Sequence, residues 1–354
     1  MKIKTALALL TCGAATAFAA VAGEIENLWP EGRIPDFQPH QIALPTNMLK
    51  SESFRAGERH MPYLEWCQPP AASNRLDVCM ILISGGGYSN WCDIGLVDDW
   101  RRRFTELGVQ CVKLVYRTPR PKGLPYYASA WADGQRAVRI VRSEAAKRGY
   151  DPEKIGAVSM SAGSHLAVLL STSSLTPAYE PIDELDKLPC HLNWALPNAI
   201  AYGLTDGLGV PNSTGGNGPD VKLDACFKFD AKTCPMCMTH GGKDPYSPIS
   251  STFVYRRLRQ MKIPAEVHIY PDRGHGAYGL ERQIEFMRQM GYFGQLAPEE
   301  ELDKRLADDT DGVTYAKSDL WPEGKMPDAQ DHQCKPYLEW YIPKQLKTKA
   351  IQII

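Results

Sequence analysis

The sequence lacks several features that would point to particular classes of protein. Its 354 residues carry a formal net charge of only −1 and no block of basic residues, which argues against a nucleic-acid partner. Beyond the N-terminus no apolar run is long enough to span a bilayer, so we expect no membrane contact there. Histidine is scarce, with eight in the chain, and no second Cys or His pair stands at zinc-finger spacing. We therefore predict a protein that works without a metal or another cofactor.

The N-terminus has the pattern of a secretory signal peptide. Lys2 and Lys4 form a basic start, residues 5–19 form an apolar stretch, and Ala20-Val21-Ala22 offers small residues at a cleavage site. We expect cleavage near Ala22 and a secreted or periplasmic protein. An uncleaved membrane anchor is the alternative interpretation.

Some cysteines could form disulfides in an exported protein, but the pairing cannot be deduced from the sequence. Nine of the ten cysteines follow residue 22, and an odd number leaves at least one unpaired even in an oxidising compartment. Cys234 and Cys237 have the spacing of a metal or redox pair. They fall in an expected strand, where residues three apart face opposite ways, so we interpret them as small buried hydrophobes.

Strand and helix patterns alternate along the chain. Expected strands are 77–83, 109–116, 155–158, 193–197, 235–239 and 265–270, and expected helices are 98–107, 128–148, 165–170, 249–261 and 281–290. This alternation predicts a mostly parallel, doubly wound sheet flanked by helices, in one domain over residues 23–293. Residues 23–75 form a Pro-rich, irregular arm of that domain, and residues 294–319 are expected to be a linker or helix.

One strand-to-helix turn has the pattern of a nucleophile elbow. The segment Ser159-Met-Ser161-Ala-Gly163 follows the apolar run Ile155–Val158 and precedes a helix-prone stretch. Small residues two positions on either side let such a turn close and expose a serine beside a helix N-terminus. Ser161, with Gly163 two residues on, fits better than Ser159. The alternative is a small-residue turn without chemistry.

A glycine run follows an earlier strand. Ser84-Gly-Gly-Gly87-Tyr88 comes directly after the strand expected at 77–83. It lacks the Lys-Ser/Thr of a phosphate loop, and a flexible turn is the simplest alternative. With an elbow serine downstream, the pattern favours an oxyanion hole built from the N–H groups of Gly86, Gly87 and Ala162. Tyr88 and Trp91 could line an acyl pocket or pack in the core.

Two further loops after strands carry an acid and a histidine. Asp244 follows the strand at 235–239, and His275 stands between glycines after the strand at 265–270. The order Ser161, Asp244, His275 is that of α/β-hydrolase triads, in which histidine activates serine and the acid orients the imidazole. Asp230 and Asp272 are rivals for the acid. Five other polar residues are interpreted as structural: His165, His240, Asp133, Tyr116 and Arg117.

These motifs resemble the bacterial acetyl esterase/lipase group of α/β-hydrolases, which includes acetylxylan and feruloyl esterases. The matching residues are Gly85–Tyr88, Tyr116-Arg117, Asp133–Arg142, Asp151–Gly156, Ser161–Ala167, His240-Gly241, Asp244 and Gly274–Gly276. The resemblance implies a serine esterase with Ser161, Asp244 and His275 as the triad. It also implies that Gly86, Gly87 and Ala162 form the oxyanion hole. The chain departs from the family pattern at Ser159 and Ser164, where glycines are usual.

The C-terminal region repeats the N-terminal arm. Leu320–Asp328 repeats Leu28–Asp36, and Pro336–Trp340 repeats Pro62–Trp66. Residues 347–354 resemble the strand at 77–83, so residues 320–354 read as a partial second copy of the arm and first strand. An alternative is a spare edge strand, in cis or across a dimer. We expect no contribution to the active site.

Together these observations predict a secreted serine esterase. It would remove short acyl groups, with acetyl the leading candidate, from a small-molecule or polysaccharide ester. A serine peptidase on the same fold is the second hypothesis. A third, prompted by Ser159 and the partial repeat, is a catalytically silent binding module. No oligomeric state is predicted.

Overall fold

A computed structural model describes residues 24–43, 61–70, 74–92, 94–205, 211–212, 220–293, 313–319 and 337–343. The chain divides into two compact units, Met1–Met287 and Arg288–Ile354, which are described separately. The expected signal segment, residues 1–22, and the possible third strand of the repeat, residues 347–354, lie outside the described residues.

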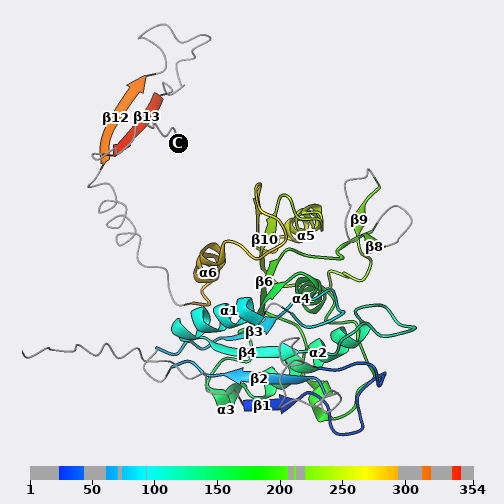
Figure 1. Cartoon of the computed structure of the whole chain (residues 1–354). Coiled ribbons are helices and arrows are strands. Elements are labelled where there is room, and N and C mark those ends of the chain that lie inside the picture. Colours follow the sequence, from blue (N-terminus) through cyan, green and yellow to red (C-terminus); the bar gives the residue numbers. More distant parts are fainter. Residues whose placement is uncertain are drawn as a thin grey trace, which may run out of the picture. The chain divides into compact units, whose positions relative to one another are not determined.

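The first unit is built on an eight-stranded sheet (Figure 1). In spatial order its strands are β1 (Glu24–Asn27), β2 (Tyr63–Cys67), β4 (Gln110–Val115), β3 (Cys79–Ile83), β5 (Ile155–Met160), β6 (Trp194–Asn198), β10 (Met236–Gly241) and β11 (Ala265–Tyr270). The six strands from β4 to β11 are parallel, and β1 and β2 are antiparallel additions. A separate small sheet holds β7 (Leu204–Thr205), β8 (Pro211–Asn212) and β9 (Lys222–Leu223).

Helices cover both faces of this sheet. They are α1 (Ile94–Glu106), α2 (Ala128–Ser143), α3 (Ala145–Arg148), α4 (Ala162–Thr172), α5 (Ile249–Gln260) and α6 (Leu280–Gln289). Figure 1 shows α1 and α6 on one side, with α2, α4 and α5 on the other. The predicted doubly wound α/β class is confirmed. The single helix expected over 128–148 is broken at Glu144. None of the described helices has the length and apolarity needed to cross a bilayer.

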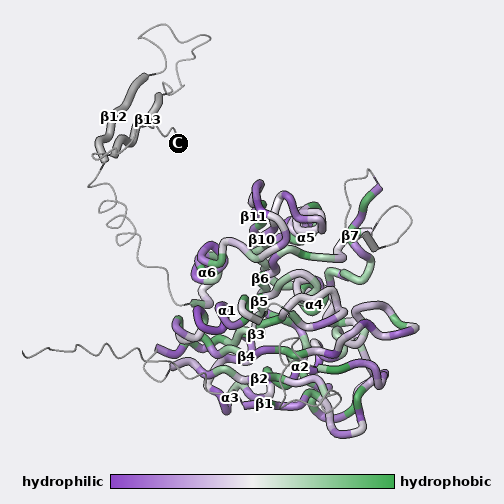
Figure 2. The backbone as a smooth tube through the Cα atoms, in the orientation of Figure 1, coloured by the Kyte–Doolittle hydropathy of each residue, from purple (hydrophilic) through white to green (hydrophobic). Residues whose placement is uncertain are grey.

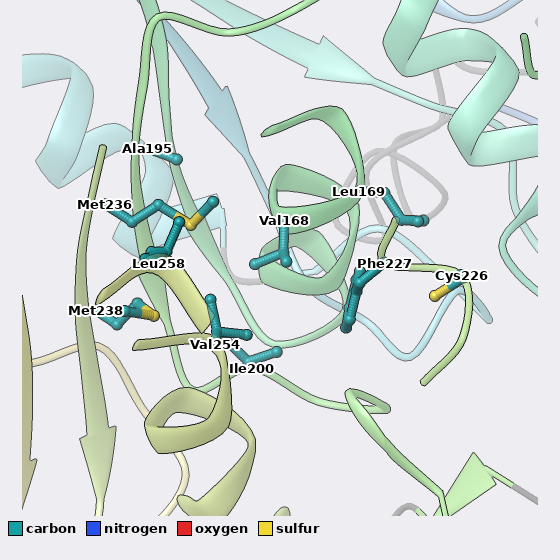
Figure 3. Close-up of a cluster of buried hydrophobic side chains, with 10 residues drawn as sticks. All are labelled: Val168, Leu169, Ala195, Ile200, Cys226, Phe227, Met236, Met238, Val254 and Leu258. Carbon is teal, nitrogen blue, oxygen red and sulfur yellow. The ribbon is translucent and has the colours of Figure 1, made fainter. Parts of the chain in front are cut away.

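The core follows from the burial of the central strands. Every residue of β3, β5 and β6 is buried, as expected for parallel strands covered on both faces. Figure 2 shows hydrophobic residues along the inner strands and more hydrophilic ones on outer helices and loops. Figure 3 shows one cluster in which α4 and α5 pack over the sheet: Val168, Leu169, Ala195, Ile200, Cys226, Phe227, Met236, Met238, Val254 and Leu258.

The N-terminal arm contains more regular structure than its sequence suggests. We expected residues 23–75 to be irregular, but β1 and β2 pair with each other and β2 extends the main sheet along β4. Beyond β1, the Trp29 indole donates a hydrogen bond of 2.8 Å to the buried Asp133 carboxylate on α2. Both strands are short and flanked by prolines, so the sequence shows no clear strand pattern. They are stabilised by pairing with distant strands and not by local propensity.

The second unit contains a two-stranded antiparallel sheet of β12 (Val313–Asp319) and β13 (Tyr337–Pro343). Residues 313–319 were expected in a linker or helix, and the structure corrects this, because Val313-Thr-Tyr315 favours a strand that has a partner. Asp319 pairs with Tyr337 and Ala316 with Trp340. The sequence-equivalent pairs in the arm are Asn27 with Tyr63 and Glu24 with Trp66. The repeat therefore reproduces the arm's hairpin in the same register.

Candidate active site

Ser161 stands at a strained turn between β5 and α4. Its backbone has φ 58° and ψ −122°, and a positive φ at a non-glycine residue marks a conformation held by its surroundings. Its N–H donates to the Asn198 carbonyl at 3.0 Å, at the end of the neighbouring strand β6. A Cβ on Gly163 would lie 2.3 Å from the Ser84 carbonyl oxygen. Only glycine therefore lets α4 start this close to the end of β3.

The structure brings Ser161, Asp244 and His275 together from three loops at the carboxyl edge of the sheet. His275 Nε2 lies 2.8 Å from Ser161 Oγ, and its Nδ1 lies 2.8 Å from Asp244 Oδ2. Ser161 is nearly buried, whereas the imidazole of His275 is 29% exposed. A hydroxyl, an imidazole and a carboxylate thus form one hydrogen-bonded chain with a partly open end.

Asp244 is held as a carboxylate. Burial alone would raise its pKa, but hydrogen bonds from His240, His275 and the Tyr246 N–H outweigh burial and lower the pKa well below its usual range. His240 also bonds Ser251 and the Tyr246 carbonyl, which is the structural role expected from the sequence. The carboxylate can therefore fix His275 with Nδ1 protonated and leave Nε2 to accept the serine proton.

The glycine loop after β3 presents free amide groups. Gly86 and Gly87 have φ values of 121° and 64°, and a Cβ on Gly86 would lie 2.1 Å from the Asn90 carbonyl oxygen. The Gly86 carbonyl accepts hydrogen bonds from the N–H groups of Ser89 and Asn90. Within the described residues, the N–H groups of Gly86, Gly87 and Ala162 donate no hydrogen bond. They are thus available to an oxyanion beside Ser161.

Tyr88 and Trp91 lie behind this loop. Each is 1% exposed, and the Trp91 indole donates to the Leu114 carbonyl at 3.0 Å. The Tyr88 hydroxyl lies 2.8 Å from Nδ1 of His165, a buried residue of α4. Of the two interpretations of Tyr88 and Trp91, this burial supports core packing. His165 is a structural hydrogen-bonding residue, as expected.

Sequence reasoning missed several polar residues that surround the triad. The Asn198 carbonyl accepts a hydrogen bond from the Ser161 N–H, and the Tyr246 N–H donates one to the Asp244 carboxylate. Arg120 and Tyr202 contact each other and the loop at Gly87. Asn198 is the last residue of β6 and Arg120 comes five residues after β4, so their positions at the carboxyl ends of parallel strands could have identified them.

The cysteines and one possible cation-binding cluster lie outside the catalytic groups described above. The eight cysteines in the described residues have no disulfide partner, and Cys234 precedes β10 instead of lying within it. Cys237, Glu266 and His268 cluster closely enough to hold a cation. Arg282, however, already pairs with both Glu266 oxygens, and burial raises the pKa of Cys237 to about 12. To bind here, a cation would have to displace the Arg282 guanidinium and remove the proton from Cys237, whose burial disfavours the thiolate.

The parallel sheet, the elbow at Ser161 and the serine–histidine–aspartate chain define an α/β-hydrolase. Comparison with known proteins agrees: residues 64–188 match the family model described as BD-FAE. The chain is similar to the acetyl ester-xyloside bifunctional hydrolase of Caldicellulosiruptor lactoaceticus, with TM-score 0.53 and 20% identity over 81% of this chain and 96% of that one. Propionate-bound esterase 2 of Thermogutta terrifontis gives TM-score 0.56 and 20% identity over 78% and 97%.

Two curated relatives share part of the sequence. Endo-1,4-beta-xylanase B of Butyrivibrio fibrisolvens is 25% identical over 212 residues, which is 56% of this chain and 32% of that protein. Esterase LipQ of Mycobacterium tuberculosis is 32% identical over 117 residues, 33% of this chain and 27% of that protein. The chain thus spans about a third of the length of these relatives. The resemblance to the esterases of this fold is confirmed.

Proposed function

We propose that the protein is a serine esterase that removes short acyl groups from a carbohydrate ester through an acyl-enzyme. The observation that carries this proposal is the chain of 2.8 Å contacts from Ser161 Oγ through His275 to Asp244. The serine lies at a strained elbow, near three amide groups that have no hydrogen-bond acceptor among the described residues. Hydrolysis of a carboxylic ester requires these parts together: a nucleophile, a base and an oxyanion site.

Each group has a defined part in the proposed reaction. Ser161 Oγ attacks the ester carbonyl carbon while its proton passes to His275 Nε2. The carbonyl oxygen becomes an oxyanion that accepts hydrogen bonds from Gly86, Gly87 and Ala162, each worth about 3 kcal/mol in such sites. The carbon–oxygen bond to the alcohol then breaks, and His275 returns the proton to the departing alcohol. Water, activated by the same imidazole, releases the acid and regenerates Ser161.

The substrate class rests on the proteins that this chain resembles. The Caldicellulosiruptor protein is named as an acetyl ester-xyloside hydrolase, and Thermogutta esterase 2 has a structure with propionate bound. Both names support a short acyl group, and the first supports a sugar as its carrier. We also propose export from the cytoplasm, on the basis of Lys2, Lys4 and the apolar stretch at residues 5–19.

Hydrolysis of 4-nitrophenyl acetate by the wild-type protein and by Ser161→Ala tests the proposal. We expect a burst of nitrophenol and a covalent acetyl group on Ser161 by mass spectrometry, both lost in the variant. Ser143→Ala, an exposed serine on α2, is the matched control and should keep full activity. Equal rates for wild type and Ser161→Ala would refute the nucleophile, and no hydrolysis by either would favour a binding module.

A substrate panel distinguishes the remaining alternatives. Acetylated xylan, feruloyl esters, longer-chain esters and dipeptide amides are compared by kcat/KM. The proposal expects acetylated xylan and short esters to be the best substrates. Preferential cleavage of the dipeptide amides would instead establish the peptidase hypothesis.

A further inference from the structure

A cationic side chain is fixed against the oxyanion loop. Arg120 follows β4 and is exposed, yet its guanidinium is oriented by two hydrogen bonds. Nε donates to the Gly87 carbonyl at 3.0 Å, and Nη2 donates to the Tyr202 hydroxyl at 2.8 Å. The guanidinium also lies over the rings of Tyr126 and Tyr202, 5.5 and 5.1 Å from their centroids. An exposed arginine is therefore held in one place beside a candidate oxyanion donor.

Two tyrosines continue from Arg120 toward the catalytic histidine. The Tyr202 hydroxyl lies 3.4 Å from that of Tyr246 and would lie 3.1 Å from a Cβ on Gly87. The Tyr246 ring is centred 5.0 Å from the His275 ring. Arg120, Tyr202 and Tyr246, which we call the rim, thus form a continuous line from the oxyanion loop to His275. The rim therefore borders two of the groups that flank Ser161, Gly87 at one end and His275 at the other.

The charge of Arg120 is not neutralised locally. No carboxylate of the described residues lies within 4.0 Å of it, whereas buried Arg117 and Arg136 pair with Asp133 and Asp183. Its two hydrogen bonds go to neutral oxygens, and a guanidinium has five N–H groups, so three remain to be used. Arginine is suited to bind carboxylate through two parallel N–H groups, and a pre-oriented guanidinium loses less entropy on doing so.

We propose that the rim is a subsite for a carboxylate group carried by the substrate, close to the scissile ester. This inference rests on the proposed esterase function. The carboxylate could belong to the acyl side, as in a half-ester of a dicarboxylic acid, or to the alcohol side, as in an acetylated uronic acid. Both present the same chemistry to Arg120, and the rim hydroxyls can orient either one.

Matched esters measured on Ser161→Ala test the subsite by binding, independently of turnover. The acyl-side pair is mono-4-nitrophenyl succinate against 4-nitrophenyl butyrate, and the alcohol-side pair is acetylated glucuronic acid against acetylated glucose. In at least one pair we expect the anionic ester to bind roughly tenfold more tightly, as one charge-assisted hydrogen bond at a partly exposed site allows. The preference should decrease as salt rises from about 0.05 to 0.5 M, because the guanidinium is exposed.

Substitution of Arg120 tests whether the rim causes the preference for the anionic ester. In the Ser161→Ala background, Arg120→Gln should abolish the preference for the anionic ester, whereas Arg120→Lys should keep part of it. Arg102→Gln, which removes an exposed arginine from α1, should leave the preference unchanged. Equal binding within both pairs, or a preference that survives Arg120→Gln, overturns the subsite. Loss of neutral and anionic binding alike would instead make Arg120 a positioning residue for Gly87.

The same substitution in the active protein separates this inference from the proposed function. With Ser161 present, Arg120→Gln should raise KM for the preferred anionic ester about tenfold more than it raises KM for the matched neutral ester. A wild-type protein that binds anionic esters selectively but hydrolyses none would refute the esterase and keep the subsite. Hydrolysis of all these esters without a preference for the anionic ones would support the esterase function and refute the subsite.

Discussion

The side-chain hydroxyls of Ser159 and Ser164 lie 3.1 Å apart, so two serines at positions where the resemblance implies glycine hydrogen-bond to each other. Ser164 Oγ also donates to the Asn198 carbonyl at 2.6 Å and lies 2.9 Å from the Asn198 N–H. The Asn198 carbonyl is the one that accepts the Ser161 N–H. The two departures from the family pattern therefore form one buried, hydrogen-bonded pair that contacts the residue holding the Ser161 N–H.

Removal of the Ser164 hydroxyl should destabilise the fold more than removal of the Ser159 hydroxyl. Ser164→Ala leaves the buried Asn198 N–H without its partner, and we expect a loss of about 1–3 kcal/mol in unfolding free energy. Ser159→Ala removes one hydroxyl–hydroxyl contact and should cost about 1 kcal/mol or less. Chemical denaturation measures both, and the double variant should show a coupling of about 0.5 kcal/mol or more.

Ser171→Ala is the matched control for these substitutions. Ser171 is also buried on α4, but within the described residues its hydroxyl has no nitrogen or oxygen partner and only the weakly accepting Cys234 sulfur beside it, so its removal should cost little. If Ser164→Ala is as harmless as Ser171→Ala, the serine pair does not support the elbow.

The hydrogen bond between Tyr88 and His165 connects the two halves of the candidate oxyanion hole. Tyr88 follows Gly87 directly, and His165 lies on the helix that begins at Ala162. Tyr88→Phe should therefore lower kcat on 4-nitrophenyl acetate, by roughly tenfold, with little change in KM. Tyr127→Phe is the control, because the Tyr127 ring lies near His165 but its hydroxyl forms no hydrogen bond within the described residues. Equal kcat for both variants would contradict a positioning role.

His165 should make the protein sensitive to acid. Burial lowers its pKa to about 3, against about 6.5 in an unfolded chain. Between these values the unfolded state binds more protons, so the stabilisation is complete above about pH 6.5 and is lost as the pH falls toward 3. The free energy of unfolding should then decrease by up to about 1.4 kcal/mol per pH unit through this group.

Unfolding free energies between about pH 6 and 4.5 identify the contribution of His165. The unfolding free energy of His165→Gln should depend less steeply on pH than that of the wild type, because glutamine at position 165 does not titrate. Tyr88→Phe removes the same hydrogen bond and keeps the histidine, so its slope should match that of the wild type. Parallel curves for wild type and His165→Gln would show that His165 is not held neutral.

Asp244 is the acid that the geometry selects over its rivals. Asp244→Asn should reduce kcat by roughly a thousandfold or more, because an amide no longer favours the required imidazole tautomer or stabilises the imidazolium. Asp272→Asn should leave kcat nearly unchanged, since Asp272 is 88% exposed and pairs with Lys243. Comparable losses in the two variants would remove the basis for assigning the acid.

The sequence predicted the parallel strands and the loops that follow them because both depend on local patterns. The apolar run at Ile155–Val158 and the glycines around His275 are visible without tertiary structure. By contrast, β1 and β2 form through pairing between residues about forty positions apart. The rim was missed for the same reason, because Arg120, Tyr202 and Tyr246 come from three separate loops. Their meeting depends on the order of the strands, which no local pattern encodes.

The C-terminal repeat provides a comparison within one chain. Trp29 and Trp321 occupy equivalent positions of the two copies, and in the first copy the indole N–H donates to buried Asp133. Trp29→Ala should lower the unfolding free energy of the hydrolase unit by about 3–5 kcal/mol, as loss of a buried tryptophan with its hydrogen bond does elsewhere. Trp321→Ala should leave the stability and the activity of the hydrolase unit unchanged.

Removal of residues 294–354 extends this comparison. All residues of the proposed triad and oxyanion hole lie in the first unit, so kcat and KM on 4-nitrophenyl acetate should remain within about twofold of the full chain. Circular dichroism establishes that the shortened chain is folded, which separates loss of function from loss of structure. A folded but inactive product would show that the repeat completes the active site, contrary to our interpretation of it as a second copy of the arm.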